Sequence, residues 1–419
     1  MCRCYIILIL LTLTLSFNLF PLSICSEAAD SAPSYSLEEL EALALKIHPA
    51  IGATAEGVKI EEGELELQKA YPNPEADVSL GQGRSLEVSE DKFEYGLEFS
   101  QMFPWLGERK WRKKTAEWGI QAAVKDLENR ELEVITDVRK IYFSILAQQR
   151  KVEITRENFL SAERLLKLIT HRVKLGEGRE IERIKAQVEY YRLERAFKKA
   201  ETVLKSQKSA LNRFLENALG VDFTLVGKIS IPESLIPIEG WQERTFTAHP
   251  LIQGTKFRVA QAKSRRKAEE QVWIPDLRLS GFYQTELDRE AYGAGLGLQI
   301  PLWNWNRGEI SKARAAERKT QFELELLKQE IQVRLISQYA QYQVAYEQAR
   351  SFEEYILKEA RRSVELAEFS YRQGEIDLLN LLDSRRIYWD TENEYISALL
   401  DFWLSQTELE RIAGGGIEG

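Results

Sequence analysis

Cysteine is missing from almost the whole chain, because its only three cysteines, Cys2, Cys4 and Cys25, lie within the first 25 of 419 residues. Disulfide bonds, cysteine nucleophiles and cysteine-ligated zinc sites are therefore excluded from residues 26–419. Positive charge is not in excess either, since 57 Lys and Arg face 65 Asp and Glu, for a net charge of −8. We expect no nucleic-acid partner, because binding to phosphates needs a basic surplus.

Proline is also scarce, and its eleven copies leave two long stretches free. The stretch between Pro104 and Pro232 has 127 residues, and the stretch after Pro301 has 118. Because proline breaks helices, both gaps predict long helices. In the first gap, apolar residues recur every seven positions, as in a coiled-coil seam: Val138, Ile145, Val152, Phe159, Leu166 and Val173.

Glycines mark the helix ends in this first stretch. Gly119 is the only glycine inside residues 108–175, so the sequence permits one helix of roughly 65 residues, or about 100 Å. Gly176 and Gly178 then interrupt the helix, and a second helical run is predicted from about residue 180 to 219. The two runs together predict a long antiparallel hairpin.

The chain also repeats itself. Three pairs of landmarks recur at offsets of 201, 197 and 198 residues: His48-Pro49 with His249-Pro250, Tyr95-Gly96 with Tyr292-Gly293, and Gly176-Glu177 with Gly374-Glu375. Unrelated domains would not hold three landmarks at nearly constant offsets. We therefore predict an internal duplication, in which each half contains a helix, a strand hairpin, a long helix and a returning helix.

Four segments alternate with a period of two, which predicts strands at residues 76–80, 93–99, 277–283 and 292–300. Alternation of apolar residues with polar residues or glycine is typical of transmembrane barrels, although two hairpins on a soluble core would show the same pattern. Aromatic residues favour the membrane interpretation, because they cluster where strands meet helices, as an interfacial girdle does: Tyr71, Trp105, Trp273, Trp303 and Trp305.

Four strands are too few to close a barrel. An unclosed edge cannot lie in lipid, because its backbone groups would stay unpaired. Several chains must therefore contribute strands. Two copies would give eight strands and three copies twelve, and counting does not choose between them.

The first 25 residues predict a secretory signal. Arg3 precedes an apolar run over residues 5–24, and small or polar residues follow from Ser26. An uncleaved membrane anchor is the alternative, although no stop-transfer pattern follows. Cys25 is also a candidate lipidation site, since residues 22–25 resemble a lipoprotein acceptor box, but Ile24 stands where a small residue is expected.

The repeated order of elements, together with "LEEL…A…HP", "SQMFPWLGERK" and "GEIDLLNLLDSRR", resembles the TolC-like outer-membrane efflux family. The resemblance implies a mixed, mostly α fold. Three chains would give four strands each to a twelve-stranded transmembrane barrel, continued by a periplasmic coiled-coil barrel. Residues 26–220 would form the first repeat (strands about 75–104, hairpin about 107–219). Residues 221–247 would form an equatorial linker, and 248–419 the second repeat (strands about 275–301, hairpin about 307–412).

The resemblance also assigns residues to the periplasmic end. Asn380 and Asp383 correspond to positions that are acidic in the family and ring the pore constriction, so Asn380 departs from the pattern. Three Asp383 carboxylates near the axis would favour cations, unless Asp383 is simply a solvated helix residue. Tyr371 and Glu182 correspond to a pair that locks the closed state. Ile376 stands where some relatives have arginine, which weakens that part of the correspondence.

The glycine tips are the expected contact with a partner. The resemblance implies that Gly176, Glu177, Gly178, Gly374 and Glu375 meet the helical hairpins of a periplasmic adaptor. Glycine at these positions also ends the helices, as it would in any hairpin. Both roles are compatible, because a helix end that faces a partner needs a close backbone approach.

Taken together, these features predict the outer-membrane channel of a tripartite exporter in a Gram-negative-type bacterium. Its partners would be two further copies, outer-membrane lipid, a periplasmic adaptor and an inner-membrane pump, of the resistance-nodulation-division type. Metal ions or small toxic compounds are the expected cargo, since "FPWLGERK" resembles metal-efflux relatives. We expect no enzyme activity, cofactor or resident metal. The alternative is a periplasmic coiled-coil scaffold without a pore.

Overall fold

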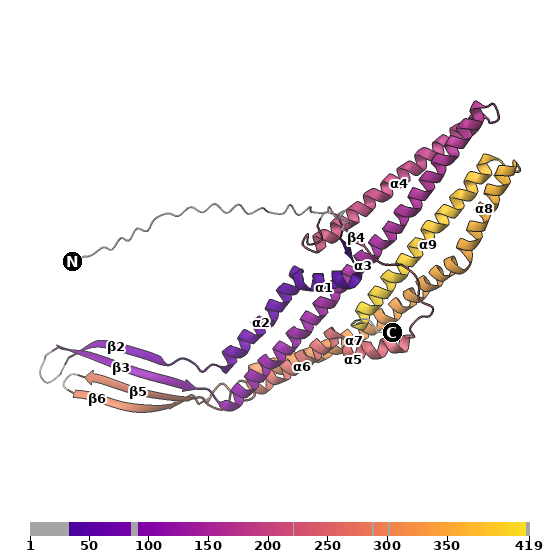
Figure 1. Cartoon of the computed structure of the whole chain (residues 1–419). Coiled ribbons are helices and arrows are strands. Elements are labelled where there is room, and N and C mark those ends of the chain that lie inside the picture. Colours follow the sequence, from indigo (N-terminus) through magenta and orange to yellow (C-terminus); the bar gives the residue numbers. More distant parts are fainter. Residues whose placement is uncertain (1–32, 85–90, 221, 287–288, 301, 416–419) are drawn as a thin grey trace, which may run out of the picture.

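The computed structural model describes residues 33–84, 91–220, 222–286, 289–300 and 302–415. The expected signal segment with Cys25 lies outside these residues. Figure 1 shows an elongated molecule with a four-stranded sheet at one end and two helical hairpin tips at the other. Within the described ranges, no helix has both the length and the apolar character needed to cross a membrane.

The first half of the chain contains two short helices, a strand hairpin and two long helices. In order, they are β1 (Ser34–Tyr35), α1 (Leu37–Ile47), α2 (Pro49–Lys69), β2 (Glu75–Arg84), β3 (Asp91–Phe103), α3 (Leu106–Lys174) and α4 (Glu180–Phe214). The 69 residues of α3 span about 100 Å, so the predicted single long helix is confirmed. Helix α2 packs along the part of α3 nearer the sheet, and α4 packs along the part nearer the tips.

The second half follows the same order. Its elements are β4 (Thr224–Leu225), α5 (Ile238–Ala248), α6 (Pro250–Glu269), β5 (Leu277–Glu286), β6 (Arg289–Leu298), α7 (Arg307–Ser351), the π-helix η1 (Phe352–Ile356), α8 (Leu357–Gln373) and α9 (Leu378–Ala413). Here α6 and α9 pack along α7, and α9 also packs along α8. Both predicted strand hairpins are confirmed.

The repeated His-Pro landmarks have the same local geometry. Each histidine follows one helix and caps the next, and the proline takes the first helical position, where its missing N–H is not needed. The Nδ1 atom of His48 accepts the N–H of Ala50 at 3.3 Å, and the Nδ1 atom of His249 accepts the N–H of Leu251 at 3.2 Å. This shared geometry fits the predicted duplication.

Three predicted boundaries differ from the structure. Helix α4 ends at Phe214, not near Leu219, because the Asn212 side chain binds the N–H of Leu219 and the carbonyl of Gly220. The predicted linker over residues 221–247 is not all linker, since it contains β4, which pairs with β1, and most of α5. The second long helix is interrupted by η1, which no sequence pattern indicated.

The core is densest around the middle of the molecule. Val138 and Ile145, from the predicted seam, are fully buried there against α1 and α4. A second cluster packs Trp241 and Phe402 with α6 and α7. Ion pairs join the halves, since Arg139 of α3 binds Glu410 of α9 and Lys140 binds Glu408 at 2.5 Å; within the first half, Arg139 also binds Glu41 of α1 at 2.6 Å. The two halves are therefore fixed to each other at this level.

The burial of His249 predicts that the folded protein loses stability at acidic pH. Burial and the nearby Arg411 cation lower the pKa of His249 from 6.5 to about 4. The folded protein keeps His249 neutral, whereas the unfolded chain binds a proton below about pH 6.5, so this residue's contribution to stability is present above that pH and lost on acidification. We expect the free energy of unfolding to fall by about 3 kcal/mol between about pH 6.5 and pH 4 on its account.

The variant His249→Asn tests this expectation. Asparagine keeps a helix-capping acceptor but has no proton to gain, so the loss of stability in this pH range should shrink. Urea unfolding followed by circular dichroism at several pH values measures it. His48→Asn, at the other junction, controls for the change of cap. An unchanged pH dependence in His249→Asn would contradict the assignment.

Candidate channel wall and helical tips

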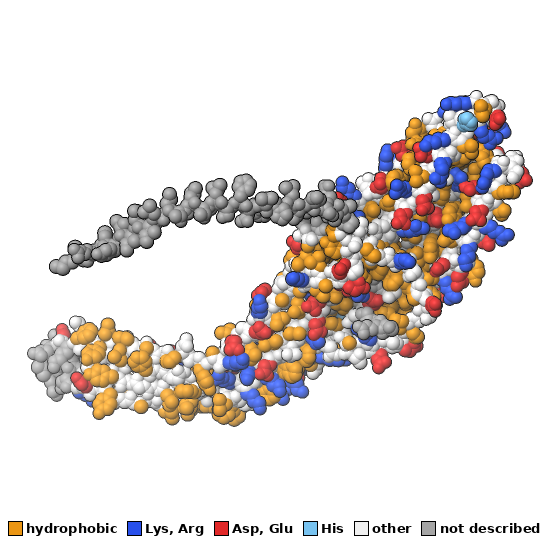
Figure 2. Space-filling view, viewed as in Figure 1, with side chains coloured by type: hydrophobic (Ala, Val, Ile, Leu, Met, Phe, Trp, Pro, Cys, Tyr) orange, Lys and Arg blue, Asp and Glu red, His pale blue; other side chains and the backbone are white. Residues whose placement is uncertain are grey.

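The four-stranded sheet has one apolar and one polar face. The strands run in the order β2-β3-β5-β6, all antiparallel, and the register pairs Val78 with Leu97, Leu97 with Tyr283 and Tyr283 with Tyr292. Figure 2 shows orange side chains over much of the sheet. The large exposed hydrophobic side chains of the apolar face are Val78, Leu80, Phe93, Tyr95, Leu97, Phe99, Phe103, Leu279, Tyr292, Leu296 and Leu298.

The opposite face is mainly polar and built largely from small residues, with Phe282 and Met102 as its larger apolar side chains. Ser79 lies beside Gly96, and Ser280 beside Gly295; a Cβ on either glycine would come within 2.6 Å of the serine Oγ. The described charges on this face are mainly acidic, with two arginines, Arg278 and Arg289, against Glu75, Asp77, Glu94, Glu98 and Glu286. Asp77 lies directly opposite Glu98. This face therefore suits water and cations rather than lipid.

The sheet does not close on itself. Among the described strands, β2 and β6 each pair on one side only, so each has an open edge of 10 residues. A lipid-exposed open edge would leave backbone groups unpaired. Further strands must therefore come from outside this chain if the apolar face meets lipid.

The aromatic residues of the predicted girdle lie at one end of the sheet, where strands join helices. Tyr71 follows α2, Trp105 precedes α3, Trp273 follows α6, and Trp303 and Trp305 precede α7. All five are exposed, and Trp303 keeps 91 % of its surface accessible. Exposed tryptophan and tyrosine at the rim of an apolar surface are typical of a membrane interface.

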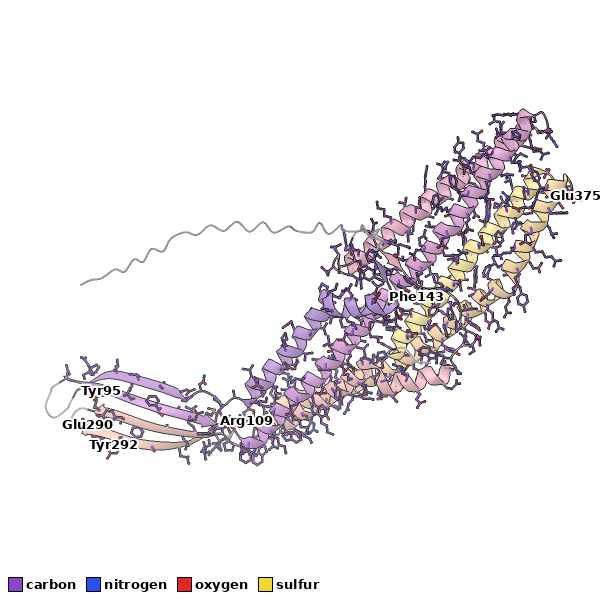
Figure 3. The ribbon with its side chains drawn as sticks, in the orientation of Figure 1. Tyr95, Arg109, Phe143, Glu290, Tyr292 and Glu375 are labelled. Atoms are coloured by element: carbon purple, nitrogen blue, oxygen red, sulfur yellow. The ribbon has the colours of Figure 1, made fainter. Side chains whose placement is uncertain are left out.

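The two tips share one backbone conformation. Gly176 has φ of +78° and Gly374 has φ of +79°, which glycine adopts without strain. At the first tip the N–H of Glu177 binds the carbonyl of Arg172, and at the second the N–H of Glu375 binds that of Ser370, both at 2.9 Å. These are Schellman helix ends. Figure 3 shows Glu375 at the far end of the molecule from the sheet.

The candidate lock residues lie near each other. An apolar cluster joins the hairpins below the tips, and Tyr371 and Ile376 pack against its edge. Burial raises the pKa of the Tyr371 hydroxyl, and the Glu182 carboxylate raises it further, while the Arg172 cation acts in the opposite direction. Glu182 and Tyr371, from different hairpins, are thus close enough to interact electrostatically, whereas the side chain to which Tyr371 hydrogen-bonds is Arg172. The structure also explains Ile376, which has an apolar environment.

Asp383 and Asn380 are exposed on α9. The Asp383 carboxylate binds Arg386 at 2.7 Å on the same helix, and this pair is about half exposed. The backbone N–H of Asn380 binds the Asp377 carboxylate, which caps the helix. No other acid of the described chain joins Asp383 in a group that could hold a metal ion. Any ring of charge at Asp383 therefore needs further copies.

Helix α4 also carries an exposed apolar seam, which was not predicted from the sequence. Ile181, Ile184, Val188 and Tyr191 are 45 to 63 % exposed, and Val188 is the most exposed of the four. Their spacing of three, four and three residues places them on one face of the helix. The heptad spacing was visible in the sequence, but only the structure leaves this face without a partner among the described residues.

Comparisons with known proteins agree with this architecture. The family model for outer membrane efflux proteins matches residues 40–217 and 243–415. The chain therefore belongs to the outer membrane efflux protein family, and it is located in the outer membrane with a large periplasmic part.

The chain is similar to curated relatives over most of its length. It is 22 % identical to the cobalt-zinc-cadmium resistance protein CzcC of Cupriavidus metallidurans, across 92 % of this chain and 91 % of that protein. It is 21 % identical to the pyoverdine export outer membrane protein OpmQ of Pseudomonas aeruginosa, across 91 % of this chain and 86 % of that protein.

Solved structures share the fold. The outer-membrane channel OprN has a TM-score of 0.74 at 16 % identity, with 91 % of this chain and 90 % of that chain covered. CusC gives 0.75 at 15 % identity, with 91 % and 92 % covered. VceC of Vibrio cholerae gives 0.72 at 15 % identity, with 91 % and 97 % covered. The mostly helical, TolC-like fold predicted from the sequence is thereby confirmed.

Substitution by alanine should destabilise the protein to different degrees at Gly374 and Gly414, although both glycines have the same backbone conformation. A Cβ on Gly374, at the tip, would meet open space, whereas a Cβ on Gly414, at the end of α9, would lie 2.7 Å from the Cα of His249. Gly374→Ala should cost about 1 kcal/mol, from left-handed strain alone. Gly414→Ala should cost about 2–4 kcal/mol, because a backbone clash is added. Chemical unfolding of both purified variants measures the difference, and equal costs would refute it.

Proposed function

We propose that three copies of this chain form the outer-membrane channel of a tripartite efflux system. Each copy would give its four strands to a twelve-stranded barrel, and its helices to a periplasmic cylinder. The observation that carries the proposal is the sheet with one apolar face, one polar face and two open edges. Such a sheet is stable in lipid only when other strands complete it.

The helical part offers a second argument for several copies. The α4 seam of Ile181, Ile184, Val188 and Tyr191 exposes apolar side chains at coiled-coil spacing. Exposed apolar side chains also occur along α7, at Phe322, Leu326, Val333 and Val344. In a cylinder of three copies, seams of this kind would be buried between neighbouring hairpins. A single copy would leave them in water.

The wall of the channel would be acidic. The polar face of the sheet would line the barrel, where Asp77 and Glu98 face each other. At the other end, we propose Asp383 as the constriction residue, with Asn380 one turn nearer the tip. The Arg386 partner reduces the charge of each Asp383. We therefore expect a moderate preference for cations.

The tips would be the contact with partner proteins. Gly176 and Gly374 turn the chain with little bulk, so a helical hairpin of a periplasmic adaptor can approach them closely. An inner-membrane pump of the resistance-nodulation-division type would deliver the cargo through that adaptor. Tyr371 and Glu182 would hold the two hairpins together in the closed state, and their separation would accompany opening.

Metal ions are the cargo that we favour, ahead of small toxic compounds. CzcC is named for resistance to cobalt, zinc and cadmium, and it matches over most of both chains. OpmQ is named for pyoverdine export and matches similarly. An acidic wall suits cations better than an anionic cargo. A periplasmic scaffold without a pore is disfavoured, because it would expose the apolar sheet face to water.

Single-channel recording tests the pore and its constriction. The purified protein in planar bilayers should give a small, cation-preferring conductance. Asp383→Asn should lower the cation preference about twofold, because one carboxylate per copy is lost near the axis. Tyr371→Phe should raise the mean conductance by weakening the closed state.

Glu365→Gln is the matched control, since it removes an exposed carboxylate from α8 rather than from the proposed constriction. It should conduct as the unmodified protein does. Absence of any conductance from detergent-extracted protein would sink the channel proposal. Conductance that is equally changed in Glu365→Gln would remove Asp383 from the constriction.

Oligomerisation tests the α4 seam. Val188→Glu should weaken the assembly, because three charged side chains would enter an apolar contact. We expect at least a tenfold shift of the protein concentration at which trimers dissociate, measured by mass photometry in detergent. Lys205→Gln, which changes the charge by the same amount elsewhere on α4, should leave the trimer intact. A stable Val188→Glu trimer would show that the seam lies outside the contact.

A further inference from the structure

A basic hollow lies where the sheet meets the helices. It opens between the end of α2 and the start of α3 and has a volume of about 530 Å³. Figure 3 places Arg109 at this junction. The acid Glu117 lines the hollow too, but the cations outnumber it, so the hollow carries a positive surplus. Five cations line it, together with the exposed Leu106: Lys69, Arg109, Lys110, Lys113 and Lys114.

Several cations in the basic hollow have no acidic partner. Lys113 is 3.8 Å from Glu117, which is a long contact, and Lys69 binds Glu66. Lys110 and Lys114 form no ion pair within the described chain. Exposed cations that are not neutralised by the protein attract an external anion. The basic hollow therefore carries positive charge that the protein's own acids do not neutralise.

Arg109 gives a second, independent sign of a ligand. Its Nη2 group binds the carbonyl of Lys69, and its guanidinium stacks on the ring of Tyr71 at 3.6 Å. These contacts hold the side chain in place. Its Nη1 group is buried yet has no hydrogen-bond partner. Six buried side-chain nitrogen or oxygen atoms of the described residues lack such a partner, and Arg109 is the only one of these six residues that lines the basic hollow, where a ligand could supply the acceptor.

The basic hollow is continuous with the apolar face of the sheet. Phe103 has the same strand parity as Leu97 and Phe99, so it lies on the apolar face. The Phe103 ring contacts Tyr71 edge to face at 6.3 Å, and Arg109 covers the other part of Tyr71. A chain of ring contacts thus leads from the lipid side of the sheet to the cations.

A neighbouring helix extends the positive charge. Lys267, near the end of α6, lies 4.1 Å from the ring centroid of Trp111 on α3. Residues 263–267 contain four cations, of which Arg266 is paired with Glu270 and Glu317. In the sequence, the lining of the basic hollow continues at Leu106, directly after the girdle residue Trp105. A band of cations beside a girdle lies at the level of phospholipid headgroups.

We propose that the basic hollow binds the phosphate of an anionic phospholipid in the periplasmic leaflet of the outer membrane. Arg109 and Lys110 would bind the phosphate oxygens, with Lys114 adding charge. An acyl chain would pass Leu106 and lie along the apolar face of the sheet. The inference rests on the membrane insertion of the barrel proposed above. Free phosphate shares the headgroup chemistry but has no acyl chain for the apolar side.

Native mass spectrometry of the purified full-length protein in detergent tests the inference. Phosphatidylglycerol and phosphatidylethanolamine with identical acyl chains are added in turn. The unmodified protein should bind phosphatidylglycerol at least fivefold more tightly. Lys110→Gln/Lys114→Gln should weaken that binding about fivefold, to the level of phosphatidylethanolamine, whose binding should stay unchanged. Arg109→Gln should do the same, because it removes the unpartnered donor.

The control is Lys205→Gln/Lys256→Gln, which removes two exposed lysines far from the sheet. It should bind phosphatidylglycerol as the unmodified protein does. Equal binding by all variants, or no preference for phosphatidylglycerol, would overturn the proposal. Inorganic phosphate that competes fully with the lipid would identify a phosphate site instead and would also overturn it.

Conductance separates this proposal from the channel itself. Recordings in bilayers of phosphatidylethanolamine alone report the pore without the anionic lipid. Conductance without any lipid preference would refute the lipid site and leave the channel standing. Lipid preference without conductance would refute the channel and leave the site as a feature of a membrane-bound protein.

Discussion

The open edges of the four-stranded sheet govern the rest of the architecture. In lipid, each unpaired backbone group costs several kcal/mol, because no water replaces the missing partner. Edges of 10 residues on β2 and on β6 make a lone sheet untenable beside its own apolar face. In lipid the sheet therefore needs strands from outside this chain, which the proposed trimer would supply. The exposed apolar seam on α4 would be buried by the same proposed assembly.

Helix α3 connects the sheet to the tips and gives the molecule its length. Around its middle, ion pairs fix it to both ends of the chain: Arg139 binds Glu41 of α1, and Lys140 binds Glu408 of α9 at 2.5 Å. Nearer the tips, a small apolar cluster and the Tyr371 region join the hairpins. Local stability follows the amount of buried apolar contact. The tips are therefore the part that can move against a fixed middle.

Local sequence patterns predicted the helices and strands. Contacts between distant segments determine the helix ends and the candidate sites, which the patterns did not predict. Period-two alternation predicted the strands, and the absence of proline predicted α3, because both signals lie within one element. The end of α4 was placed too late, since it depends on how the Asn212 side chain binds the turn that follows. The surroundings of Tyr371 combine four helices and the basic hollow combines two, so no single stretch of sequence contains either.

The net charge of the whole chain does not reveal its strongest local cluster of positive charge. The total of −8 argued against nucleic acid as a partner, yet five of the six residues 109–114 are cationic. The acids are spread along solvated helices and the polar sheet face, whereas these cations gather at one level beside exposed aromatic rings. Electrostatic attraction to a surface depends on the charges within about a Debye length of it. For a protein that crosses a membrane interface, the charge at each depth in the membrane therefore says more about possible ligands than the net charge of the whole chain does.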